Sequence, residues 1–394
     1  MSVTFIIGNG FDLNLGLPTS YKDYLKVYRK DAMDYPANHI LRRFKLEVLS
    51  GEDWMWSDFE EGLGHRSILF EGENNDKQAK DFISCFENFC INFTGYLKEV
   101  CKRVDVPQDN ETMMHDFIRS FCMFYKHLSE PEAALKLKQK VSGLNLNFLQ
   151  FNYTDILDRL IEESDLSNKL QGGIKRLGKN LHIHGHVNDS SPVMGVGRAD
   201  QIRSDVIQSN PDVQADFIKT NILNTFKEAN LPPGNHTSSA IDVIKNSSVI
   251  CIYGCSIGAT DIAWWEHIGN WLKDDPDNEK ELVIFGKRDK PMLGILSTQI
   301  RAIRDRAKKE KEDTIKRFLK YAGLPSQYDT YHPGKIIIEL EHDLFDFKLV
   351  HSPIIINFKK LIPLDPGPDD ILEIVPDDIL DADPDATLET GNSE

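Results

Sequence analysis

Short apolar runs alternate with amphipathic segments along most of this 394-residue chain. The runs are typical of buried strands, and the segments between them repeat apolar positions every three or four residues, as helices on a core do. This alternation favours an α/β fold with a parallel sheet covered on both faces by helices. We expect strands at 3–7, 144–151, 181–184, 248–253, 282–285 and 336–340, and helices at 20–30, 155–161, 200–246, 261–273 and 293–322.

The segment 31–143 interrupts this alternation, because nearly all of it has the pattern of helices. Its clearest feature is a stripe of large apolar side chains three or four positions apart, which must be buried against another surface. We therefore divide the chain into a core made of residues 1–30 and 144–360, a helical insert at 31–143 and a tail at 365–394. The stripe consists of Phe82, Phe86, Phe89, Phe93 and Leu97.

The composition fits a globular protein of the cytoplasm. Hydrophobic residues make up 40% and charged residues 27%, and no apolar run approaches the roughly 20 residues that a membrane span needs. The first residues lack the basic start and the apolar length of a signal peptide. Six cysteines occur without a Cys-x-x-Cys pair, which argues against disulfides and structural zinc. We expect a cytoplasmic location, no membrane partner and no metal.

The negative charge is concentrated towards the end of the sequence. The formal net charge is −16, and residues 365–394 contain eleven acidic residues and no Lys or Arg, so the rest carries only −5. Such a tail is typical of a disordered, regulatory or solubilising segment. Basic residues cluster between 301 and 311, but acidic residues alternate with them, which favours a solvated helix face. The charge therefore argues against a nucleic acid partner.

A glycine-rich turn follows the first expected strand. Residues 8–18 read Gly-Asn-Gly-Phe-Asp-Leu-Asn-Leu-Gly-Leu-Pro, and glycines at a strand-to-helix turn let the backbone approach a pyrophosphate. The common dinucleotide fingerprint needs a third glycine at position 13, where this chain has Leu13. On this segment alone, a purely structural turn explains the glycines equally well.

Two polar side chains follow other expected strands. Asn152 comes directly after the run 144–151, where a ribose hydroxyl or a water would lie, although it would also serve to cap the next helix. His184, in the sequence His-Ile-His-Gly-His at 182–186, is placed to act as a general base, and its alternative is a loop or core histidine. A metal cluster of the three histidines is less favoured, because zinc ligands usually come from separate elements.

A second glycine-rich turn follows the strand expected at 248–253. Residues 254–258 read Gly-Cys-Ser-Ile-Gly, and Asp261 comes three positions later. This turn resembles a second loop that contacts phosphate or ribose. Ser256 also fits the Gly-x-Ser-x-Gly pattern of hydrolase nucleophiles by its letters, so a serine hydrolase stays an alternative.

The motifs together resemble a known family. Gly-Asn-Gly-Phe-Asp at 8–12 with Gly-Leu-Pro-Thr-Ser-Tyr at 16–21, Phe-Asn-Tyr-Thr at 151–154 and Ile-His-Gly at 183–185 resemble the AbiH family of phage abortive-infection proteins. Trp-Ser-Asp-Phe-Glu at 56–60 is also similar to that family, although Ser57 and Glu60 form a capping box that needs no catalytic role. The order of the motifs looks like that of sirtuins as well.

These resemblances imply a sirtuin-like, Rossmann-type parallel sheet with a large helical insertion, and NAD as substrate. The implied activity is NAD glycohydrolysis, which yields nicotinamide and ADP-ribose, in anti-phage defence. His184 would be the catalytic base, and Asn152 would position water or a ribose hydroxyl. The NAD-binding residues would be Gly8, Asn9, Gly10, Asp12, Gly16, Pro18, Ser256 and Asp261.

The chain also departs from the sirtuin pattern. It lacks the four-cysteine zinc module of sirtuin deacylases, has Thr154 in place of an acidic residue, and has Asp12 in place of a serine. These differences argue against deacylation. A sensor that binds NAD or ADP-ribose without cleaving it, or a defence scaffold, stays open as an alternative, with a second copy or a phage-derived trigger as partner. We expect the insert to cover the nucleotide cleft or to form an oligomer interface.

Overall fold

A computed structural model describes residues 1–49, 59–70, 75–107, 109–188, 192–286, 297–340 and 342–352. The tail expected at 365–394 lies outside these residues. Among the described helices, none combines the length and the apolar character that crossing a membrane requires.

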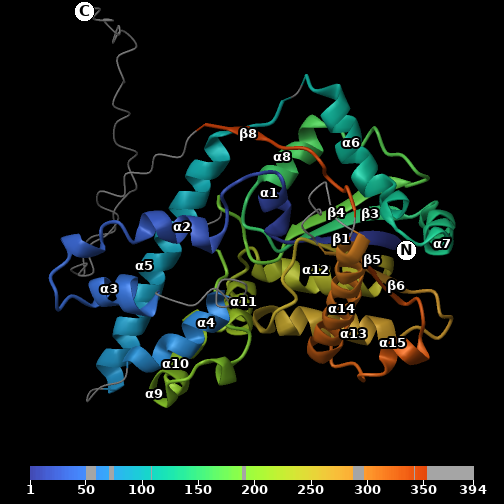
Figure 1. Ribbon diagram of the computed structural model, residues 1–394. Helices are drawn as coiled ribbons and strands as arrows, with labels where there is room; N and C mark the ends of the chain where they lie inside the picture. Colours follow the sequence, from blue (N-terminus) through green and yellow to red (C-terminus); the bar gives the residue numbers. More distant parts are fainter. Residues whose placement is uncertain are drawn as a thin grey trace, which may run out of the picture. The chain divides into compact units, whose positions relative to one another are not determined.

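One parallel sheet confirms the α/β prediction. Its six strands have the order β4-β3-β1-β5-β6-β7, which is the order of classic doubly wound sheets (Figure 1). Each expected strand is present, but β4 begins five residues earlier than the expected strand at 181–184 and ends at His182. The bounds are β1 Ser2–Ile7, β3 Asn145–Gln150, β4 Arg176–His182, β5 Ser247–Tyr253, β6 Glu281–Phe285 and β7 Ile336–Glu339. A separate antiparallel pair joins β2 Val104–Asp105 to β8 Val350–His351.

Alternate side chains of the central strand β1 pack into two different helical layers. Ile6 belongs to an apolar cluster shared with α12 (Gly234–Lys245), α13 (Ile262–Lys273) and α14 (Ser297–Tyr321). Phe5 faces the other way, and its ring centroid lies 4.9 Å from that of Phe121 in α6 (Glu111–Cys122). Helices therefore cover both faces of the sheet, as Figure 1 shows.

The remaining helices connect these layers or form the segment between β1 and β3. The α-helices are α1 Gly10–Asn14, α2 Tyr21–Tyr28, α3 Ile40–Arg43, α4 Phe59–Arg66, α5 Asn75–Lys102, α7 Pro131–Val141, α8 Ile156–Glu163, α9 Asp205–Ser209, α10 Pro211–Phe217, α11 Lys219–Glu228 and α15 Tyr328–Tyr331. The 3-10 helices are η1 Ala32–Asp34, η4 Ser67–Phe70, η5 Phe124–His127, η6 Ala199–Gln201 and η7 Ala259–Asp261, and η2 Phe44–Val48 is a π-helix.

The segment expected as a helical insert, 31–143, has two structural roles. Its α6 and η5 form part of the layer on the sheet, where Phe121 contacts both Phe5 and Phe148. Its longest helix, α5, buries the whole predicted stripe from Phe82 to Leu97. This helix lies beside the opening loop of the core, because the Tyr96 hydroxyl donates a hydrogen bond of 2.7 Å to the Pro18 carbonyl.

The loops after β1 and β5 pack backbone against backbone. β1 lies where the strand order reverses, and its carboxyl end is next to that of β5. The Gly10 amide donates to the Gly254 carbonyl at 2.8 Å, and a Cβ atom at Gly10 would lie 2.5 Å from the Cα atom of Gly254. Gly254 itself has a φ of +69°, a left-handed conformation that favours glycine. Close packing of the two loops is therefore sufficient to require glycine at these positions.

Gly10→Ala should lower the free energy of unfolding by about 1–3 kcal/mol, since the new methyl group would meet backbone atoms that have little freedom to shift. The matched control is Gly95→Ala in α5, where a Cβ atom would meet nothing within 4 Å. That change should be neutral or stabilising by about 0.5–1 kcal/mol. Urea denaturation followed by circular dichroism measures both, and similar values for the two variants would contradict this account of the loops.

Candidate functional site

Asn152 and His184 follow neighbouring strands at the carboxyl edge of the sheet. Asn152 lies two residues after β3 and His184 lies two residues after β4, and the Ile183 amide continues the pairing of these strands by donating to the Gln150 carbonyl at 2.8 Å. The Phe151 ring lies 5.0 Å from the His184 ring. Both predicted side chains are only 3% exposed. The strand topology thus brings them to one place, inside the protein rather than on its surface.

A carboxyl–hydroxyl pair lies beside Asn152. Asp12 is completely buried in α1, and its Oδ2 atom accepts a hydrogen bond of 2.6 Å from the Thr154 hydroxyl. Burial raises the pKa of Asp12 to about 6, and hydrogen bonds from Thr154 and Asn152 limit the rise. Asp12 and Thr154 are two of the positions where the chain departs from the sirtuin pattern. In this structure the two side chains are hydrogen-bonded to each other. The carboxylate is at position 12, where the sirtuin pattern has a hydroxyl, and the hydroxyl is at position 154, where that pattern has a carboxylate.

A buried chain of charged side chains starts from His184. Its Nε2 atom lies 3.2 Å from Asp261 Oδ1, which also contacts Lys219 Nζ at 2.9 Å. Lys219 Nζ lies 3.0 Å from Glu60 Oε2. The hydroxyl groups of Tyr21 and Tyr153 donate to Glu60 Oε1 at 3.2 and 3.4 Å. The insert, through Glu60, is therefore linked to the histidine of the core.

The charges of this network balance only in part. Burial alone would lower the pKa of Lys219, but Asp261 and Glu60 outweigh it and hold this pKa well above its ordinary value. Burial would likewise raise the pKa of Asp261, but Lys219 and His184 hold it well below the usual range of a carboxyl group. With both carboxylates ionised and Lys219 protonated, the three groups carry one net negative charge.

Other predicted NAD-binding residues shape the opening loop through contacts within the protein. The Gly8 and Gly10 amides donate to the carbonyls of Tyr253 and Gly254, so they are occupied by these bonds. Asn9 exchanges hydrogen bonds with Thr19: the Thr19 hydroxyl donates to Asn9 Oδ1 at 2.6 Å, and Asn9 Nδ2 donates to the Thr19 carbonyl. Gly16 has a φ of +91° just after α1, and the Pro18 carbonyl accepts from Tyr96.

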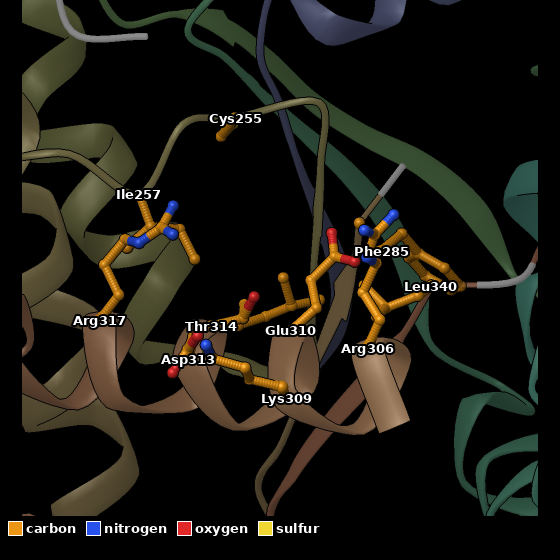
Figure 2. Close-up of a pocket in the computed structure, with 12 residues that line it drawn as sticks. Cys255, Ile257, Phe285, Arg306, Lys309, Glu310, Asp313, Thr314, Arg317 and Leu340 are labelled. Carbon is orange, nitrogen blue, oxygen red and sulfur yellow. The ribbon is translucent and has the colours of Figure 1, made fainter. Parts of the chain in front are cut away.

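The loop after β5 separates the buried network from a surface cavity. Asp261 reaches the network, whereas Cys255 and Ile257 line a cavity of about 440 Å³ at the ends of β6 and β7 (Figure 2). Figure 2 shows Arg317 extending from α14 towards Ile257 of this loop, and Arg306 extending towards Phe285. The full lining is Cys255, Ile257, Ile284, Phe285, Gly286, Arg306, Lys309, Glu310, Asp313, Thr314, Arg317 and Leu340.

Ser256 lies on the same loop with its side chain exposed. Within the described part of the chain, no side-chain hydrogen bond joins Ser256 to a histidine, whereas a serine nucleophile needs such a base. The carboxylate of Asp261, which follows this loop, is instead paired with His184 and Lys219.

The family model for bacteriophage abortive infection AbiH matches residues 4–278. The chain belongs to the AbiH family. Membership implies a role in phage abortive infection. The match covers the whole His184 network of this AbiH-family protein and ends before α14, which forms one wall of the cavity. No curated protein sequence matches the chain.

Two members of the network were missed by reasoning from sequence. Glu60 belongs to the Trp-Ser-Asp-Phe-Glu motif and was interpreted as part of a capping box, although the side chain is in fact buried against Lys219. Ser57, the other half of that box, lies outside the described residues. Lys219 follows two buried residues, Phe217 and Ile218, and no local pattern distinguishes it from a surface lysine. The similarity of residues 56–60 to the family was the available signal for Glu60.

Lys219→Met should lower the free energy of unfolding of this AbiH-family protein by about 3–5 kcal/mol, because two carboxylates would stay buried without their cation. Adding Asp261→Asn should recover part of the loss, since it removes one unpaired charge. Lys102→Met, at an exposed Lys102–Glu99 pair on α5, should change the value by less than about 1 kcal/mol. Urea denaturation tests this, and additive effects of the two network changes would argue against coupling.

Asp12→Asn should reveal the raised pKa of Asp12 as a pH dependence of stability. Because the folded state favours protonated Asp12, this group's contribution is fully present below its unfolded pKa of 3.8 and is lost as the pH rises through about 6. The variant's free energy of unfolding should thus gain about 2.5 kcal/mol relative to wild type between pH 4 and pH 8. Asp277→Asn, at an exposed position, should show no such gain. Denaturation across this pH range measures both variants.

Proposed function

We propose that this protein binds NAD at the carboxyl edge of its sheet and hydrolyses the bond between nicotinamide and ribose as its contribution to phage defence. The observation that carries the proposal is the contact of His184 with Asp261 at 3.2 Å, at the same edge of the sheet as Asn152. A histidine oriented by a carboxylate is a usual arrangement for a general base. Ligands of doubly wound sheets bind at this edge, near the point where the strand order reverses.

The charge of the network suits cleavage of a glycosidic bond. The C1′–N bond breaks with its electron pair leaving on nicotinamide, and the ribose passes through a state with positive charge at C1′. One net negative charge on Glu60, Lys219 and Asp261 would stabilise that state. Water would then bond to C1′ and give its proton to His184, while Asn152 orients the water or a ribose hydroxyl. A positioned base supplies about 10²–10⁴-fold, so orientation and electrostatics must supply the rest.

The cavity beside the β5 loop supports a dinucleotide as ligand. Three basic side chains, Arg306, Lys309 and Arg317, outnumber the two acidic ones, Glu310 and Asp313, and offer positive charge to a diphosphate. Phe285 and Leu340 offer apolar surface to a base. The loop that lines the cavity with Cys255 and Ile257 continues directly to Asp261 in the network. A ligand of the length of NAD could therefore contact both regions.

The burial of the two proposed catalytic residues favours an alternative. His184 and Asn152 are each 3% exposed, so a substrate reaches them only if the surrounding side chains move. A sensor that binds NAD or ADP-ribose at the cavity, without cleaving it, requires no such opening. Turnover of NAD separates the two functions, because the sensor would bind NAD and release no nicotinamide.

Purified protein incubated with NAD should release nicotinamide, which chromatography quantifies. His184→Ala should lower the rate at least ~10²-fold by removing the proton acceptor, and Asn152→Ala should have a similar effect. The two losses should not add in the double variant, because the residues act on one step. His115→Ala, at an exposed histidine on α6, is the matched control and should retain the parent rate.

Calorimetric titration with NAD completes the test. Asn152→Ala should bind NAD about as well as the parent, because the proposed diphosphate contacts are untouched. Binding without any release of nicotinamide would establish the sensor instead. Parent rates in either single variant would remove His184 and Asn152 from the mechanism.

A further inference from the structure

Three potential metal ligands converge outside the network described above. Asp158 comes from the first turn of α8, His182 is the last residue of β4, and His186 lies in the turn that follows. One ligand atom from each residue lies within 4.8 Å of the other two. His182 Nε2 is 3.0 Å from Asp158 Oδ2, and the two histidine ring centroids are 4.7 Å apart.

The turn after β4 explains why these histidines separate from His184. On a fully extended strand, residues 182, 184 and 186 would point to the same side. Gly185 has a φ of +80°, so the chain turns before His186. His184 therefore pairs with Asp261, whereas His186 lies back against His182. Asp158 joins from the crossover helix between β3 and β4, so the three ligands come from separate elements.

Neighbouring amides fix the orientation of the carboxylate. Asn180 Nδ2 donates to Asp158 Oδ1 at 2.7 Å, and the buried amide of Gln150 donates to the same oxygen at 3.2 Å. The Oδ2 atom faces His182. Supporting hydrogen bonds of this kind are typical around metal ligands, where they hold a carboxylate in the geometry that binding needs. The side chains of His182 and Asp158 are 15% and 35% exposed, so ions from solvent can reach them.

We propose that Asp158, His182 and His186 bind a divalent transition metal of the zinc class. Two imidazoles and one carboxylate are a common donor set for Zn²⁺, and three protein ligands leave a fourth position for water. Tetrahedral ligands at zinc distances are roughly 3.3 Å apart, so the Asp158–His182 pair is already close to the required spacing.

Binding requires changes at two of the ligands. His182 Nε2 must exchange its contacts with Asp158 Oδ2, at 3.0 Å, and with the Gln150 amide nitrogen, at 3.2 Å, for a metal bond. His186 must also move. Its ring must approach the other two ligands and exchange the hydrogen bond of 3.1 Å that its Nδ1 atom accepts from the Asn188 amide for a metal bond. This set differs from the cluster of three histidines that the sequence disfavoured, because Asp158 replaces His184. The expectation of no metal would thus be revised. Spacing along the chain does not reveal this site, because Asp158 comes from the helix α8. The inference is independent of NAD turnover.

The test is titration of chelator-treated, metal-free protein with Co²⁺ and then Zn²⁺. We expect one Co²⁺ per chain with the visible absorption of a tetrahedral site and without the charge-transfer band of cysteine ligands, and we expect Zn²⁺ to displace it. His186→Ala should weaken binding at least tenfold, and so should Asp158→Asn. His332→Ala, at an exposed histidine near α15, should bind like wild type. Zn²⁺ should also raise the melting temperature of wild type but not of His186→Ala.

Each other outcome counts against the site. Equal affinity of wild type and His186→Ala would show that the metal binds elsewhere, and a cysteine charge-transfer band would identify the thiols as its ligands. Absence of binding to wild type would leave the three side chains as a hydrogen-bonded cluster. Circular dichroism of His186→Ala, whose substitution is at a half-buried turn, separates loss of the site from loss of the fold.

Discussion

A lysine buried between two carboxylates couples the helical insert to the sheet. Lys219 is 4% exposed, and a charge at such a position is tolerated only when it is paired. Its partners come from distant parts of the chain, Glu60 in α4 and Asp261 in η7. The same contact places the Asp261 carboxylate against His184. The geometry of the candidate base therefore depends on the insert as much as on the sheet.

Close packing of two loops sets where this network lies. The backbone after β1 rests on the backbone after β5, and glycines at 10 and 254 make that distance possible. The η7 turn that carries Asp261 follows the second loop directly. A glycine motif that looks like a phosphate-binding loop in sequence thus has a structural task of its own. The two tasks are compatible, but the packing alone accounts for the glycines at both positions.

The strands of the sheet could be predicted from the sequence, because strands buried on both faces consist of nearly continuous apolar runs. β4 was the exception: it is an edge strand whose residues Arg176 and Lys179 are exposed, so only its last residues look like a strand. The places of Asn152 and His184 after neighbouring strands could be predicted, because strand ends define the edge of a parallel sheet. Glu60, Lys219 and the pairing of Asp158 with His182 were not found, because ion pairs between distant elements leave no periodic pattern.

The distribution of charge connects the two regions of the proposed NAD site. Carboxyl groups lie at this edge of the sheet, where Asp12 is hydrogen-bonded to Asn152 and Thr154 and Asp261 contacts His184. The cavity has more basic than acidic side chains, because Arg306, Lys309 and Arg317 line it together with Glu310 and Asp313. The charges of NAD are complementary to these two regions: its nicotinamide ring is cationic and would face the carboxyl groups, and its diphosphate is anionic and would face the basic side chains. If NAD binds as proposed, loss of nicotinamide removes the end that the carboxyl groups attract, so the site would hold NAD more firmly than ADP-ribose. Product release would then follow from the same electrostatics that favour cleavage.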